Sequence, residues 1–138
     1  MKKLLLVVLL VSSLFAGDFE KGLEAAERGD YQTALKLWKP LAEQGDPEAQ
    51  HNLGIMYKNG NGVKQDYKEA LKWFRLAAEQ GYADAQYNLG VSYYYGEGVS
   101  KDKIKSYQWW LKAAKQGYTN AQYNLDILCK ESPWACQK

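Results

Sequence analysis

The sequence has little of the side-chain chemistry on which most enzyme classes depend. It contains a single histidine, His51, and two cysteines among 138 residues. A lone histidine lacks the further ligands that a metal site needs, and no partners for a His-dependent catalytic triad are evident. Its Gly-x-Gly turns follow predicted helices instead of strands, so they do not indicate a dinucleotide or phosphate loop. We therefore expect no metal site, no cofactor and no catalytic residues.

Neither sign of charge is in excess. The 18 lysines and arginines face 16 aspartates and glutamates, and two of the lysines, Lys2 and Lys3, lie at the extreme N-terminus. Without these two lysines the chain has a net charge near zero. A nucleic-acid partner normally requires a basic stripe, so we expect none.

Long apolar runs are missing after the first 16 residues. Residues 1–16 read MKKLLLVVLLVSSLFA, with two lysines, an apolar core and a small residue at the end, which is typical of a secretory signal peptide. The run from Leu4 to Ala16 would span only ~20 Å as a helix, against ~30 Å of hydrocarbon. No cysteine follows it to carry a lipid. The sequence predicts export to the periplasm or the medium, without membrane insertion after cleavage.

What the sequence does have is an internal repeat with a 36-residue offset, seen when residues 44–81 are compared with residues 80–117. Identical pairs include Asn52/Asn88, Leu53/Leu89, Gly54/Gly90, Gly60/Gly96, Asp66/Asp102 and Trp73/Trp109. A fixed period of this length indicates a stack of repeated units.

Each copy has the pattern of two helices joined by a glycine-containing turn. Gly54 lies inside the first helix, where glycine costs ~1 kcal/mol relative to alanine, so we expect a neighbouring helix to approach closely there. Asp66 is a predicted N-cap, and Glu69 gives it the spacing of a capping box. The second helix has apolar residues at helical spacing, namely Ala70, Leu71, Trp73, Phe74, Ala77 and Ala78, and in its copy Ile104, Trp109, Trp110, Ala113 and Ala114.

The units before and after these copies are atypical, as terminal repeats usually are. We expect one domain over 17–138, with a capping hairpin at 18–45, repeats at 46–81 and 82–117, and a C-terminal half-repeat at 118–138. The capping hairpin keeps the second-helix pattern, but its first helix, roughly residues 19–28, lacks the Leu-Gly-x-x-Tyr motif.

The motif A-x-x-x-L-G-x-x-Y-x-x-G-x-G-V-x-x-D, followed by A-x-x-W and A-A-x-x-G, resembles the Sel1-like repeat family, a relative of the tetratricopeptide repeat. The resemblance implies an all-α solenoid of αα hairpins in a right-handed superhelix. It also implies an adaptor scaffold that holds partners on a concave face lined by first helices. Similarity to the cysteine-rich Hcp family of exported Sel1-repeat proteins implies an alternative, a β-lactam-binding or β-lactam-hydrolysing protein.

That alternative has little support from the residues themselves. Ser100 and Lys103 fit the letters S-x-x-K, but the companion signatures of serine β-lactamases are absent. The chain also lacks the cysteine pair that the Hcp family has in every repeat.

Six first-helix residues are the candidate binding surface: His51, Asn52, Tyr87, Asn88, Tyr123 and Asn124. Together with Gln50 and Gln86 they are expected to face the groove, where amides and aromatic rings would clamp an extended peptide or a protein. The asparagines have a second interpretation, in which they bond adjacent backbone and hold the repeats together.

Cys129 and Cys136 are the only cysteines, and an even pair in an exported chain predicts a disulfide. We expect it to fix Trp134 against the open end of the stack. The sequence thus predicts a non-catalytic protein- or peptide-binding scaffold, with β-lactam binding as the alternative. A specific inhibitor or immunity-type partner of another exported protein is a third hypothesis.

Overall fold

The computed structural model describes residues 17–137, so the predicted signal peptide falls outside the described residues. Within this range the chain is helical and has no strand. The elements are α2 (Asp18–Glu27), α3 (Tyr31–Glu43), α4 (Pro47–Asn59), α5 (Tyr67–Glu79), α6 (Ala83–Tyr95), α7 (Lys103–Lys115), α8 (Thr119–Glu131) and the short 3-10 helix η1 (Pro133–Cys136).

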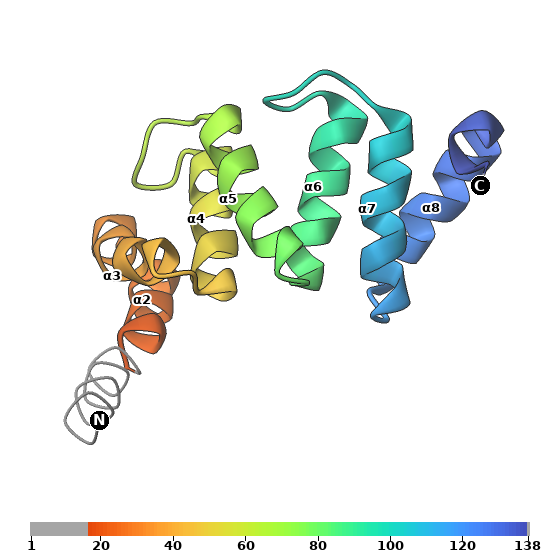
Figure 1. Ribbon diagram of the computed structural model, residues 1–138. Helices are drawn as coiled ribbons and strands as arrows, with labels where there is room; N and C mark the ends of the chain where they lie inside the picture. Colours follow the sequence, from red (N-terminus) through yellow and green to blue (C-terminus); the bar gives the residue numbers. More distant parts are fainter. Residues whose placement is uncertain (1–16, 138) are drawn as a thin grey trace, which may run out of the picture.

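The helices pack as successive hairpins, and each helix lies mainly against its neighbours in the chain. Figure 1 shows the hairpins side by side in a row, with α2 and α3 at one end and α8 at the other. Contact between adjacent units alone is the mark of a solenoid. The predicted all-α stack of αα hairpins is confirmed.

Aspartate side chains begin four of the helices. Asp66 Oδ1 accepts hydrogen bonds from the backbone N–H groups of Lys68 and Glu69, and Asp102 Oδ1 accepts one from Lys105. The capping box predicted for Asp66 and Glu69 is only half formed. The Asp66 N–H donates to Tyr57 O instead, and Glu69 Oε1 accepts from Trp73 Nε1. Glu69 is thus used to anchor a core tryptophan.

Glycine in the first helix lets a large aromatic ring of the second helix lie directly on its backbone. A Cβ atom on Gly54 would lie 2.5 Å from Phe74 Cδ1, and one on Gly90 would overlap Trp110. The close approach expected from the helical glycines is confirmed, and the approaching group is an aromatic ring.

The capping hairpin uses the same contact, which the sequence pattern missed. Gly22 in α2 lies under Trp38, and a Cβ there would overlap the indole. The Asp30 N–H donates to Ala25 O just as the Asp66 N–H donates to Tyr57 O. The turn of this hairpin is therefore four residues shorter, and α2 matches α4 at an offset of 32, not 36.

One predicted core residue is exposed. Ile104 is 47% exposed because it lies in the first turn of α7, in register with the exposed Lys68 of the preceding repeat. The buried position of that turn is occupied by Ser106, whose hydroxyl donates to Gly90 O at 2.7 Å.

Candidate functional site

One position of the first helix carries an aromatic or histidine ring in every repeat. With the offsets above, Phe19, His51, Tyr87 and Tyr123 are equivalent residues of α2, α4, α6 and α8. Trp38 Nε1 donates to Phe19 O and Trp110 Nε1 donates to Tyr87 O, which gives two of these positions the same environment. We call these residues the ring row. Three of its members are half-buried, and Tyr123 is exposed.

His51 is held between two repeats. Its ring centroid lies 5.8 Å from that of Phe74 and 5.4 Å from that of Tyr82, and the Asn88 amide Nδ2 is 3.1 Å from its Nε2. Burial lowers the pKa of His51 below its ordinary value of 6.5, with the Asp84 carboxylate acting in the opposite direction. The neutral imidazole is therefore the form that fits this interface.

We expect the free energy of unfolding to fall as the pH drops below 6.5, the ordinary pKa of histidine. The unfolded chain takes up the proton first, so stability decreases until the pKa of His51 in the folded state is passed. Urea unfolding at a series of pH values measures this slope. His51→Tyr, which copies Tyr87, removes the contribution of the imidazole and leaves the carboxylates in place. Equal slopes in the two proteins would contradict the assignment.

Tyr87 and the asparagines link the following repeats in the same way. The Tyr87 ring lies 5.1 Å from Tyr118 and 6.5 Å from Trp110, and its hydroxyl accepts a long hydrogen bond of 3.4 Å from Asn124 Nδ2. Asn88 Nδ2 also donates to Asp84 O at 2.9 Å. Asn88 and Asn124 thus each contact the ring-row residue of the preceding repeat through their side chains.

The six candidate residues have three different environments in the structure. His51, Tyr87, Asn88 and Asn124 are half-buried and form the two inter-repeat pairs. Tyr123 is 66% exposed, because no repeat follows α8 within the described residues. Asn52 lines a cavity of about 340 Å³ between α2 and α4.

Two glutamines expected on this surface are buried. Gln50 Nε2 donates to Ala42 O, and Gln80 Nε2 donates to Gln50 Oε1 at 2.8 Å. Gln86 makes the equivalent bonds with Ala78 O and Gln116 in the next repeat. Each of these two amides thus links the second helix before it to the end of the second helix after it, and this explains why both glutamines are buried.

Charge is segregated between the two kinds of helix. The first helices, α2, α4, α6 and α8, contain eight carboxylates and three cationic side chains. The second helices, α3, α5 and α7, contain three carboxylates and nine cationic side chains. Burial and the neighbouring carboxylates of Asp46, Glu20 and Asp84 raise the pKa of Glu48. The net charge of the sequence is near zero because the acidic first helices and the basic second helices cancel.

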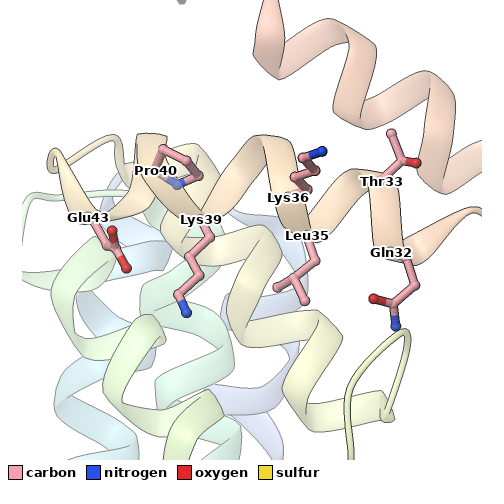
Figure 2. Close-up of a pocket in the computed structure, with 7 residues that line it drawn as sticks. All are labelled: Gln32, Thr33, Leu35, Lys36, Lys39, Pro40 and Glu43. Atoms are coloured by element: carbon pink, nitrogen blue, oxygen red, sulfur yellow. The ribbon is translucent and has the colours of Figure 1, made fainter.

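A further cavity, of about 660 Å³, lies along α3 (Figure 2). All seven of its labelled residues belong to this one helix, and their side chains point to both sides of it. Gln32 is engaged with the loop of the next repeat, since its Nε2 donates to Gly62 O at 2.7 Å. The cavity thus has no convergent set of polar groups.

At the C-terminal end, the structure places Cys129 and Cys136 at disulfide distance, with Sγ atoms 2.03 Å apart. The expectation for Trp134 is wrong: its side chain is 57% exposed, while Ser132 and Ala135 on either side of it are buried. The short helix η1 packs its small residues against α7 and α8, which turns the indole outward.

The S-x-x-K residues are not joined in the structure. Ser100 is exposed in the loop, and the ammonium group of Lys103 donates to Ser132 Oγ at 2.8 Å. Among residues 17–137 no group of three histidine, cysteine, aspartate or glutamate side chains could hold a metal ion. In the same part of the chain, no helix combines the length and apolarity needed to cross a bilayer.

The stacked hairpins and their inter-repeat side chains define a helical-repeat scaffold of the kind found in protein-interaction modules. The family model described as Sel1 repeat matches residues 16–46, 47–82 and 83–118. The chain belongs to the Sel1 repeat family, whose repeats generally mediate protein binding. No curated protein matches it.

The solved structures that are similar to the chain include two repeat proteins. One is a protective antigen present in uropathogenic Escherichia coli strains, with an SLR fold, 37% identity and a TM-score of 0.82 over 87% of this chain. The other is a Sel1 repeat protein from Oxalobacter formigenes, with 35% identity and a TM-score of 0.78 over 82% of this chain. The chain spans 27% and 46% of the lengths of these two proteins.

Proposed function

We propose that the chain is an exported, non-catalytic scaffold that binds a protein or extended peptide on the face formed by its first helices. The observation that carries this proposal is the ring row with its flanking asparagines, which repeats at a fixed position along α4, α6 and α8. Its last member, Tyr123, is 66% exposed. Exposed tyrosine is enriched at protein interfaces because it combines a large apolar ring with a polar hydroxyl.

Two observations support an exported location. Residues 1–16 have the pattern of a secretory signal peptide. Cys129 and Cys136 lie at disulfide distance, and disulfides persist mainly in oxidising compartments such as the periplasm and the extracellular medium. The similar Escherichia coli protein is described as a protective antigen, and an exported position of this chain fits that description.

The first test selects binders from a displayed library of random peptides and measures their affinity for single variants. We expect Tyr123→Ala to weaken the selected peptides by about fivefold or more, as truncation of an interface aromatic residue commonly costs over 1 kcal/mol. Because Tyr123 is exposed, the variant keeps its thermal stability.

Tyr67→Ala is the matched control. Tyr67 is 40% exposed but lies on α5, a second helix. Its removal leaves the affinity unchanged if the first helices form the binding face. Equal losses in the two variants, or a library that yields no binder, would contradict the proposal.

A further inference from the structure

A groove between α2 and α4 opens on the side of the first helices. Its cavity of about 340 Å³ has a predominantly apolar lining. The side chains that matter for the argument are Leu23 and Ala26 from α2, Trp38 from α3, and Asn52, Ile55 and Met56 from α4. Leu23 is 39% exposed at its rim. The cavity is large enough for one bulky apolar side chain.

The groove is open because of one residue of the capping hairpin. At the offset of 32, Ala26 of α2 is equivalent to Lys58 of α4. At the regular offset of 36, Lys58 is in turn equivalent to Tyr94 of α6. At the next interface Lys58 Nζ lies 3.0 Å from Glu97 Oε2, with both side chains only 21% exposed. Between α6 and α8, Tyr94 lines the cavity equivalent to the one between α2 and α4. That cavity has a volume of only about 100 Å³.

Carboxylates border this opening. Glu20, Glu24 and Glu27 follow one another at the helical spacing i, i+4 and i+7, so they form a stripe along α2 next to Leu23. Glu27 also lines the cavity itself. Glu48 lies at the start of α4, where burial and the neighbouring carboxylates of Asp46 and Glu20 raise its pKa.

Among residues 17–137 no lysine or arginine forms an ion pair with these carboxylates. Within residues 17–137 the ion pairs are Lys21 with Asp18, Lys58 with Glu97, and Lys72 with Glu69. None of them involves a glutamate of the groove. A ligand with cationic groups on both sides of an apolar anchor therefore gains electrostatic complementarity here, whereas an acidic segment is repelled.

We propose that the groove between α2 and α4 takes a partner segment with one bulky apolar side chain flanked by lysine or arginine. The apolar side chain enters the cavity above Trp38 and Met56, and the cationic side chains lie along the glutamate stripe. The inference rests on the proposed scaffold function, because it assigns the partner class for one end of the same face.

The test uses two capped synthetic peptides of equal length with a central leucine, one flanked by lysines and the other by glutamates. Titration calorimetry on the purified chain is expected to show binding of the lysine peptide only, with affinity that falls as salt is added. Binding of both peptides alike, or of the glutamate peptide alone, would overturn the proposal.

Ala26→Tyr supplies the decisive variant, because it fills the cavity with the residue that the chain itself has at Tyr94. We expect the lysine peptide to bind at least about tenfold more weakly, because the variant removes the space in which the leucine side chain would be buried. Glu27→Gln is expected to weaken it about two- to fivefold, the range for an exposed ion pair. Glu79→Gln, on the second helix α5, is the matched control and leaves the affinity unchanged.

The outcomes separate this proposal from the scaffold function. If the library peptides depend on Tyr123 while Ala26→Tyr leaves the lysine peptide unaffected, the scaffold function stands and the groove assignment is wrong. Sedimentation of the purified chain tests the competing occupant, a second copy. A dimer that Ala26→Tyr dissociates would likewise overturn the assignment to a basic segment.

Discussion

Replacement of Phe74 by alanine is expected to lower the free energy of unfolding by about 3–5 kcal/mol. The side chain is fully buried in the middle of the stack, where it lies on the backbone of Gly54 and beside the His51 ring. Gly54 has no side chain that could refill the space, so most of the cavity remains. The loss is a large fraction of the roughly 5–15 kcal/mol that stabilises a domain of this kind.

Urea unfolding followed by helical circular dichroism measures this loss. Leu76→Ala is the control on the same helix, because Leu76 is 40% exposed and its truncation creates no enclosed cavity. A second substitution sharpens the test. Gly54→Ala is expected to destabilise the native protein but to stabilise the Phe74→Ala variant, since the new methyl group would lie 2.5 Å from an atom that is no longer there. Volume-conserving core substitutions usually cost less than about 1.5 kcal/mol. A loss below that value for Phe74→Ala would contradict the packing of Phe74 on Gly54.

The stack of hairpins was predictable because a fixed repeat period of 36 residues indicates repeated structural units. Glycine, aspartate and the large aromatic residues recur at fixed positions, and each has a local physical role that the structure reproduces. The period failed in α2, where a turn shorter by four residues displaced the register and hid the equivalence of Gly22 with Gly54. The equivalence of α2 with α4 is seen only in the contact of Gly22 with Trp38 and in the matching hydrogen bonds of the two turns.

The candidate site was predictable in position but not in its contacts. Helical spacing placed the asparagines and three members of the ring row on the first helices, but the shifted register of α2 left out Phe19. It contains no information on which repeat each side chain contacts, so the pairs of Asn88 with His51 and of Asn124 with Tyr87 were not specified. The outward turn of Trp134 likewise depends on how η1 docks, which no local pattern encodes.

The cavity beside Ala26 had a sequence signal that only the corrected register reveals. A small residue stands there at a position where the other repeats have lysine or tyrosine. Charge segregation was also readable in principle, once the charges are summed over alternate helices instead of over the whole chain.

The loop glycines give the second large effect, and two of them form a matched pair. Gly98 has a φ of +71° and Gly81 a φ of +91°, so alanine at either position must adopt a left-handed conformation. They differ in what surrounds them. A Cβ atom on Gly98 would lie 2.5 Å from Tyr67 O and 2.9 Å from Lys68 N, at the start of α5 in the preceding hairpin, whereas nothing lies within 4 Å of one on Gly81.

We therefore expect Gly81→Ala to cost only the conformational term of about 1–2 kcal/mol. Gly98→Ala adds a clash with the backbone, which cannot rotate away as a flexible side chain can. Overpacking of this kind costs about 1–3 kcal/mol, so its total reaches about 2–5 kcal/mol. Parallel urea unfolding of the two variants measures the difference. If both lose the same stability, the loop of residues 96–102 does not press on α5, and the contact between adjacent hairpins depends on their helices alone.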